Sequence, residues 1–340
     1  MVRGVINTDQ QAEHLRQKSV TASERSVLLS RLSGSDQEPD LTVPTNCEGF
    51  GRIRHFKTST APNWPSNPLP ILPAAKALGL ADGQTTMEAQ VYQNAACPWR
   101  CWYCFVPYPL LSANSKKSKW FTVSELVDLF ENEPDGCPSV IDLSGGSPDL
   151  IPEWPVWMME ELEARGLDQQ TFLWSDDNLS TDWLFTKLSN AQLERMQSYK
   201  NYGRVCCFKG IDERSFAFNT NAEPSGFEFQ LQVMDRLLDL DLDVYGYITL
   251  TDPSSDNIDS RMSAFFDRLQ TIHEFLPLRI VPLQIGVYGP VEPRMNDEFD
   301  ASLAVQEVAI QHWNVEIEKR FSLEDRHRPI TDVSLRRSQA

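Results

Sequence analysis

The sequence predicts an α/β fold in which helices cover a parallel sheet. Three observations support this class. Six short apolar runs alternate strictly with six longer amphipathic segments, which is the pattern of repeated strand–helix units. The hydrophobic content of 41% is ordinary for a globular chain, and 340 residues can bury one large core with room for a terminal addition. Right-handed crossovers curl such a sheet into a full or partial barrel, although the same periodicity also fits a doubly wound sheet.

The predicted strands are the apolar runs that follow residue 82. They are Met87–Gln93, Val140–Leu143, Thr171–Trp174, Arg204–Phe208, Val244–Leu250 and Leu278–Ile285. The predicted helices are Val123–Glu131, Pro152–Arg165, Thr181–Tyr199, Gly226–Leu240, Ile258–Phe275 and Glu298–Phe321. Residues that commonly cap helices stand at the start of three of these stretches, namely Thr122, Thr181 and Asp297.

The predicted barrel occupies residues 83–322, preceded by an N-terminal extension (1–82) and followed by a C-terminal tail (323–340). Within the extension, Ala22–Leu32 has the pattern of an amphipathic helix. Prolines crowd the second half of the extension between Pro44 and Pro73. This composition disfavours regular structure and predicts an extended wrap or linker.

Composition and charge exclude some partners. The formal net charge is −17 and the isoelectric point about 4.7, which disfavours a large phosphate-binding surface, so we expect no nucleic-acid partner. The short basic run at Lys116, Lys117 and Lys119 is typical of a solvated surface. No apolar run approaches the roughly 18 residues of a membrane span, and the first residues lack the apolar core of a signal peptide. We therefore expect a cytoplasmic protein without a membrane partner.

Three cysteines, Cys97, Cys101 and Cys104, lie directly after the first predicted strand with the spacing C-x₃-C-x₂-C. A short loop of this kind can fold its thiolates around one small metal centre, and thiolates are the ligands that iron–sulfur clusters select. Three ligands leave one corner of a four-iron cluster open. Buried hydrophobic cysteines and a zinc or redox site are the alternatives. A structural zinc site needs a fourth ligand, and neither His55 nor His273 has a suitable spacing.

With the aromatic Tyr103 just before the last cysteine, this motif resembles the signature of the radical S-adenosylmethionine (SAM) superfamily. The resemblance implies a [4Fe–4S] cluster on Cys97, Cys101 and Cys104, with SAM as cofactor on the fourth iron and Tyr103 against its adenine. It implies an oxidoreductase-like enzyme that takes an electron from a flavodoxin or ferredoxin, cleaves SAM reductively and abstracts a hydrogen atom from a substrate. Because the family carries this loop after its first strand, the resemblance favours a partial (β/α)6 TIM-like barrel over a doubly wound sheet.

Further candidate SAM contacts follow the second and third predicted strands. Gly145 and Gly146, followed by Ser147, resemble the family's Gly-Gly-Glu-Pro element, whose backbone meets the SAM amino group. Ser147 replaces the usual glutamate, so only the backbone contacts are implied. After the third strand, the short polar side chains of Ser175 and Asp177 are candidates to bind the ribose or the methionyl carboxylate, or else cap a helix.

The end of the fourth strand resembles the activating enzymes of glycyl-radical enzymes. In those enzymes a lysine meets the SAM carboxylate, and Lys209 occupies the matching position. Cys207 stands where their cation-binding aspartate would be, and we favour a buried thiol there. On the fifth strand, Tyr247, Thr249 and Thr251 alternate onto one face and are candidates to line the substrate cavity.

The remaining cysteines indicate a single cluster. Cys47, Cys137, Cys206 and Cys207 form no further C-x₂-C run, so auxiliary clusters are not expected. The predicted substrate is a protein, in which a glycyl residue would lose a hydrogen atom, or alternatively a peptide or small molecule. A non-catalytic iron–sulfur electron-transfer protein is a further alternative. No side chain stands out as a catalytic residue.

Overall fold

A seven-stranded sheet forms the centre of the molecule in the computed structural model, which describes residues 4–59, 61, 64–133 and 136–337. The strand order is β10-β9-β8-β7-β6-β4-β3. Six strands run parallel: β4 (Thr86–Tyr92), β6 (Val140–Leu143), β7 (Phe172–Asp177), β8 (Tyr202–Phe208), β9 (Val244–Thr249) and β10 (Ile280–Leu283). The edge strand β3 (Gly51–Lys57) is antiparallel to β4.

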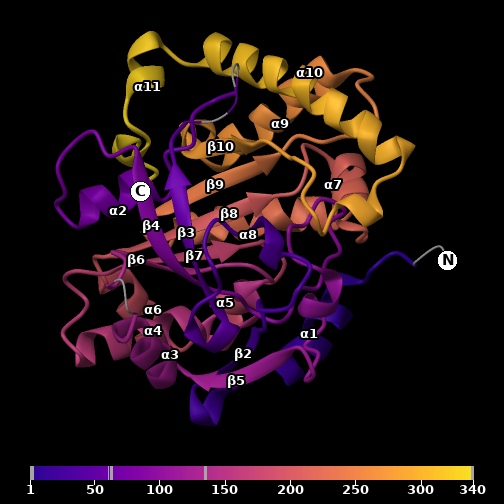
Figure 1. The fold of residues 1–340 in the computed structure, drawn as a ribbon. Coiled ribbons are helices and arrows are strands. Elements are labelled where there is room, and N and C mark those ends of the chain that lie inside the picture. Colours follow the sequence, from indigo (N-terminus) through magenta and orange to yellow (C-terminus); the bar gives the residue numbers. More distant parts are fainter. Residues whose placement is uncertain (1–3, 60, 62–63, 134–135, 338–340) are drawn as a thin grey trace.

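The six parallel strands correspond to the six predicted ones, and they lie side by side in the order in which they follow along the chain (Figure 1). The sheet curls into a half-barrel that stays open between its edge strands β3 and β10. The predicted α/β class and the partial TIM-like barrel are therefore confirmed. The sequence did not predict β3, which extends the sheet by one antiparallel strand.

Helices cover the outer face of this sheet. They are α3 (Val123–Glu131), α4 (Glu153–Ala164), α5 (Trp183–Lys187), α6 (Asn190–Ser198), α7 (Glu213–Thr220), α8 (Gly226–Leu238), α9 (Ile258–Ile272) and α10 (Asp297–Arg320). Thr122 caps α3 with a capping box, as predicted. The predicted single helix Thr181–Tyr199 is wrong, because Ser189 forms its own capping box and starts α6 as a second helix. Thr181 and Asp297 are not caps, since Asp182 and Asn296 precede α5 and α10.

The N-terminal region is more regular than predicted. The predicted helix Ala22–Leu32 is wrong: Ser26–Ser30 forms strand β2, whose five residues are all buried. It pairs with β1 (Val20–Thr21) and with β5 (Ser118–Thr122) in a small antiparallel sheet. Helix α1 (Thr8–Ser19), which the sequence did not predict, lies ahead of it and begins at the N-cap Asn7.

The proline-rich segment also contains regular structure, contrary to the prediction. It includes β3 and the first residues of α2 (Ile71–Ala77). From residue 64 the chain crosses the inner face of the half-barrel. The Trp64 indole donates to the carbonyl oxygen of Pro282 on β10 (2.9 Å), and the Asn67 amide donates to the Tyr247 hydroxyl (3.3 Å). Ile71 and Ala74 of α2 then join the inner core. Residues 64–77 thus strap the open side of the sheet.

The C-terminal tail packs beside this strap. After α11 (Leu323–His327), Lys76 forms an ion pair with Asp332 (2.7 Å), and the Arg279 guanidinium donates to the carbonyl oxygen of Val333 (2.7 Å). Residues 1–3, 60 and 62–63 of the predicted extension and 338–340 of the predicted tail lie outside the described residues. The division into extension, barrel and tail stays a prediction.

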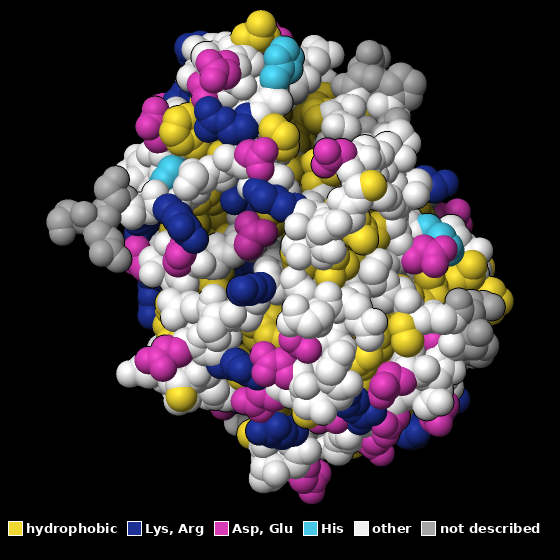
Figure 2. Space-filling view, turned by 90° about the vertical axis from the view of Figure 1, so that its left-hand side faces the viewer, with side chains coloured by type: hydrophobic (Ala, Val, Ile, Leu, Met, Phe, Trp, Pro, Cys, Tyr) yellow, Lys and Arg dark blue, Asp and Glu magenta, His cyan; other side chains and the backbone are white. Residues whose placement is uncertain are grey.

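The surface carries charges of both signs. On the face shown in Figure 2, basic and acidic side chains are interspersed, with apolar side chains visible between them. Among the helices of the described residues, none combines the length and the apolar character needed to cross a membrane.

Candidate functional site

The cysteine loop connects β4 to β5 and has one short 3₁₀ turn, Tyr108–Leu111. Cys97 and Cys101 are buried and Cys104 is half-buried, and all three are free thiols. Burial raises the pKa of Cys97 to about 12 and that of Cys101 to about 11. The Cys97 and Cys101 thiols are therefore protonated at neutral pH, and a metal centre that binds them must displace these protons.

The donor types suit an iron–sulfur cluster, although the described residues contain no group of three or more His, Cys, Asp or Glu side chains already placed to hold a metal ion. The other two thiols of the triplet raise the Cys97 pKa, so they lie within electrostatic range of it. Arg100 lowers the pKa of Cys97, and Lys209 lowers that of Cys101. Neutral thiols do not attract one another, whereas a bound cluster supplies the positive charge that holds thiolates together. The residues present fit a centre held by anionic thiolates.

Two arginines donate hydrogen bonds to the backbone carbonyl groups of this irregular loop. Arg100 donates to the carbonyl oxygens of Cys97 and Trp99 (both 2.7 Å) and to the Ser112 hydroxyl (3.1 Å). Arg294, from the segment after β10, donates to the carbonyl oxygens of residues 102, 104 and 106 at 3.3, 2.7 and 3.0 Å. Loop carbonyls without secondary structure need such donors when they are buried. The two guanidinium groups therefore hold the fold of the cysteine loop.

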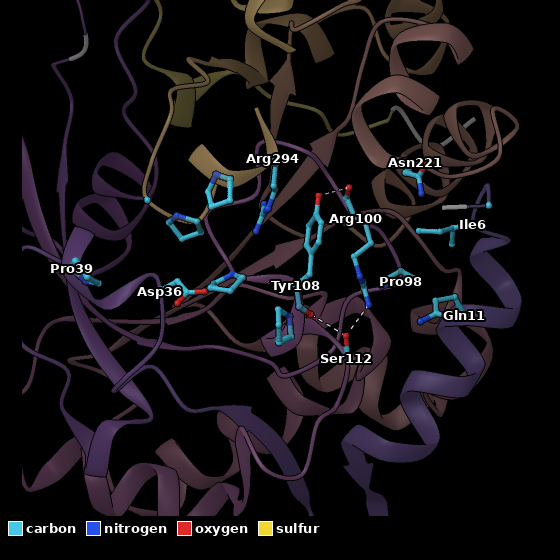
Figure 3. Close-up of a pocket in the computed structure, with 16 residues that line it drawn as sticks. Ile6, Gln11, Asp36, Pro39, Pro98, Arg100, Tyr108, Ser112, Asn221 and Arg294 are labelled. Atoms are coloured by element: carbon cyan, nitrogen blue, oxygen red, sulfur yellow. Dashed lines mark hydrogen bonds between the residues drawn. The ribbon is translucent and has the colours of Figure 1, made fainter. Parts of the chain in front are cut away.

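A cavity of about 940 Å³ lies against the outer side of this loop (Figure 3). Its wall combines the loop with the N-terminal segment near Ile6 and with the segment after β10. Tyr108 stands between the two arginines, and the Arg294 guanidinium stacks on its ring at 3.9 Å. The residues that line this cavity include neither the Gly145–Gly146 turn nor Lys209.

The Gly145–Gly146 turn follows β6 and packs directly on the start of the cysteine loop. Both glycines have positive φ angles, +75° and +65°. A Cβ atom on Gly146 would lie 2.4 Å from the carbonyl oxygen of Asn94 and 2.7 Å from that of Ala96, so only glycine fits. The Ser147 amide donates to the Ala96 carbonyl (2.7 Å). The Ser147 hydroxyl is buried and donates to Asp149 (2.6 Å), which leaves its backbone as the group next to the loop.

Lys209 follows β8 and is tied to the same loop. The Asn219 amide donates to the Lys209 carbonyl (2.8 Å), and the Trp102 indole donates to the Asn219 side-chain oxygen (3.2 Å). Burial lowers the pKa of the Lys209 ammonium, but the ionisable thiols and the phenol around it, Cys207 first and then Tyr103, raise that pKa above its ordinary value. Tyr103 shares a hydrogen bond with Thr249 on β9 (3.0 Å). Loop, glycine turn and lysine therefore lie at the carboxyl ends of β4, β6 and β8, at the same edge of the sheet.

Ser175 and Asp177 lie on the helix-covered face of β7. Ser175 shares a hydrogen bond with the Tyr202 hydroxyl (2.8 Å). Asp177 forms a buried ion pair with Arg204 (2.6 Å). Because side chains alternate along a strand, Asp176 points to the opposite, inner face, as Trp174 does. The structure thus brings Asp176 rather than its two neighbours to the interior where the cysteine loop and Lys209 converge.

Four charged residues on the inner face form what we call the inner-wall cluster: Arg52, Arg54, Asp142 and Asp176. Asp142 is fully buried, and neither of its carboxylate oxygens has a hydrogen-bond partner among the described residues. Burial, followed by the nearby Asp176, raises the pKa of Asp142 to about 8. Asp176 accepts a hydrogen bond from the Ser144 hydroxyl (2.6 Å), and burial raises its pKa as well.

Sequence reasoning missed this cluster. The alternation that begins at Phe172 and Trp174 would have indicated Asp176, because residues two apart share a face. Arg52 and Arg54 had no such signal, since they lie on β3, the strand that the sequence did not predict.

Comparison with known proteins gives no family model that matches this chain and no match among curated proteins. Similar solved structures include Streptococcus suis SuiB bound to its precursor peptide SuiA and SuiB bound to S-adenosylmethionine. Each has a TM-score of 0.38 at 12% identity and covers 62% of this chain and 53% of that one. A structure of TYW1 with a lysine–pyruvate adduct has a TM-score of 0.37 at 10% identity, covering 80% and 89%. The chain thus matches about half the length of SuiB.

Proposed function

We propose that this chain is a radical SAM enzyme that abstracts a hydrogen atom from a bound substrate. One observation carries the proposal: the cysteine loop, the Gly145–Gly146 turn and Lys209 meet at the carboxyl edge of one half-barrel. Direct hydrogen bonds through Ala96 and Asn219 join them. Ligands of parallel α/β barrels bind at this edge.

In this proposal Cys97, Cys101 and Cys104 hold a [4Fe–4S] cluster. When bound, that cluster supplies the electron that cleaves SAM and so starts radical chemistry. The chain's own residues would bind and orient the cofactor: the Gly145 and Gly146 backbone would hold its amino group, and the Lys209 ammonium would attract its carboxylate. Tyr103, which shares a hydrogen bond with Thr249, would contact the adenine. Arg100 and Arg294 keep the loop folded around the centre.

Asp176 is the side chain of β7 that we propose for a polar cofactor contact. Ser175 and Asp177 brace the strand from the helix side, through Tyr202 and Arg204, and so position Asp176 on the inner face. They act as positioning residues in this arrangement. A flavodoxin or ferredoxin is the proposed electron donor.

The substrate proposal favours a peptide or small molecule over a glycyl residue of a partner enzyme. In the activating enzymes that the Lys209 segment resembles, an aspartate two residues before the lysine helps to hold a cation. Cys207 occupies this position and is a buried thiol whose pKa burial raises to about 12. A protonated thiol is a poor ligand for a hard cation. The structure of SuiB bound to its precursor peptide is consistent with a peptide substrate.

The test is anaerobic reconstitution with iron and sulfide, followed by reduction in the presence of SAM. We expect brown cluster absorbance, and 5′-deoxyadenosine as the product. Cys101→Ala should abolish both, whereas Cys137→Ala, which removes an exposed free thiol outside the loop, should change neither. A cluster that forms without any cleavage of SAM would instead indicate an electron-transfer protein. Zinc without cluster absorbance would refute the ligand assignment.

A further inference from the structure

Two members of the inner-wall cluster, Arg52 and Asp142, lie in one row across three strands. Arg52 on β3 pairs with Val91 on β4, and Val91 pairs with Asp142 on β6. Directly paired residues project to the same side of a sheet, so the guanidinium of Arg52 and the carboxylate of Asp142 stand on either side of Val91. Two strand spacings separate their Cα atoms by about 10 Å, a gap that the long arginine side chain shortens.

Asp142 lacks the hydrogen bonds that a buried carboxylate needs. Its nearest cation is Arg54, whose guanidinium nitrogen lies 3.8 Å from one carboxylate oxygen, too far for a hydrogen bond. Leaving both oxygens unpaired is costly, since buried polar groups in folded proteins are almost always satisfied. A ligand that carries hydrogen-bond donors, above all an ammonium group, would remove this cost.

Arg52 has the complementary deficit. Its Nε is buried without a hydrogen-bond partner among the described residues, and its guanidinium stacks on Phe105 of the cysteine loop at 5.2 Å. A guanidinium presents several donors in one plane and pairs with a carboxylate through two parallel hydrogen bonds. A ligand that carries a carboxylate would satisfy it.

This wall adjoins the proposed SAM site. Phe105, which contacts Arg52, follows Cys104 directly, and Asp176 lies near both Asp142 and Lys209 electrostatically. Arg52, Arg54 and Asp176 are each partly exposed, whereas Asp142 is fully buried. A molecule bound there would lie beside the place where hydrogen abstraction is proposed.

We propose that the inner-wall cluster binds the substrate, and that the substrate is a zwitterion, a free amino acid whose ammonium group pairs with Asp142 and whose carboxylate pairs with Arg52. Arg52 is a cation, and an ammonium group placed at Asp142 would hold its carboxyl group as an anion. The two groups that flank Val91 would then match the two charges of an amino acid. This assignment rests on the proposed function for its chemistry, but binding can be measured without turnover.

The experiment uses isothermal titration calorimetry on the full reconstituted chain with SAM present. The probes are the standard free L-amino acids, together with the N-acetyl and the amide derivative of any that binds. We expect a free amino acid to bind at least about tenfold more tightly than either derivative, since each derivative has lost one charged partner.

Variants assign the two charges separately. Asp142→Asn should weaken binding of the free amino acid at least about tenfold and leave the N-acetyl derivative unaffected, because that derivative has no ammonium group. Arg52→Gln should weaken the free amino acid similarly and leave the amide unaffected, and Arg52→Lys should fall between. Glu88→Gln and Arg31→Gln make the same chemical changes on β4 and beside Phe50, outside the wall, and serve as controls.

Three results would overturn the assignment. One is the absence of binding by every free amino acid, and another is equal binding of a free amino acid and its blocked derivatives. The third is a loss of SAM affinity in Asp142→Asn as large as the loss for the amino acid, which would make the wall part of the SAM site. The formation of 5′-deoxyadenosine is measured in parallel. Its absence would refute the proposed function, while the binding pattern still decides the inner-wall assignment.

Discussion

Replacing Asp142 with Asn should stabilise the free protein, and the gain should grow with pH. Asp142 is fully buried, and Asp176, Arg52 and Arg54 are the charged groups that act on it. Its pKa rises from 3.8 to about 8 in the folded chain. The folded state therefore keeps a proton that the unfolded state releases above about pH 4, and the free energy of unfolding falls as the pH rises from about 4 to 8.

The size of this stability difference follows from the pKa shift of Asp142. At pH 7 the unfolded carboxyl group lies about three pH units above its pKa, while the folded group is still largely protonated, which costs the fold roughly 4 kcal/mol. Asn has nearly the same shape and cannot ionise, so Asp142→Asn removes this cost. The variant should match the wild type near pH 4 and exceed its stability by roughly 4 kcal/mol at pH 7.

Urea unfolding of the anaerobic, cofactor-free chain, followed by circular dichroism from pH 4 to pH 9, measures this difference. Asp177→Asn is the matched control on the opposite face of the sheet. Because that change leaves Arg204 buried and unpaired, it should destabilise the fold by about 3–5 kcal/mol. A stability difference between Asp142→Asn and wild type that does not change with pH would refute the assignment of Asp142 as an unpaired buried carboxyl group.

Three further changes test the surroundings of the site. Gly146→Ala forces a Cβ atom onto the Asn94 carbonyl and should lower the free energy of unfolding in urea by at least about 2 kcal/mol. Gly166→Ala is the control: its φ of +69° is similar but a Cβ atom there meets open space, so the loss should be about 1 kcal/mol. Arg294→Ala removes three hydrogen bonds to the cysteine loop and should lower stability by about 3 kcal/mol and iron content by more than half; unchanged iron loading would show that the loop folds without it. Ser189→Ala removes the cap that starts α6 and should cost about 1 kcal/mol, read as a lower Tm, and an unchanged Tm would contradict the capping role.

The sequence predicted most of the parallel strands well because they are largely buried on both faces and therefore appear as mainly apolar runs, as in Val244–Thr249. It failed at β2 because a run of Val and Leu this short can belong either to a strand or to a buried helix, and its length does not distinguish the two. It also failed at β3, where alternate residues are the arginines 52 and 54. Charged side chains on the inner face reverse the usual pattern of apolar residues inside and polar residues outside. Their positions make sense only when their partners on the other strands are known.

The candidate site shows the same division. The cysteine loop, the glycine turn and Lys209 could be located because each carries a local motif. Asp176 differs from its neighbours Ser175 and Asp177 only in the direction of its side chain, which depends on where the strand begins. Asp142 gives no local signal at all: its importance comes from missing partners, which become visible only when the surrounding strands are in place.

The contact between Arg294 and the cysteine loop has a consequence for the order of folding during synthesis. The guanidinium of Arg294 donates to the Cys104 carbonyl from a position 190 residues further along the chain. At a synthesis rate of 5–20 residues per second, the loop leaves the ribosome roughly 10–40 s before its clamp exists. During this interval the three thiols are exposed on an unfinished chain. A nascent chain stalled before Arg294 should therefore react faster with thiol reagents at these cysteines than the completed protein.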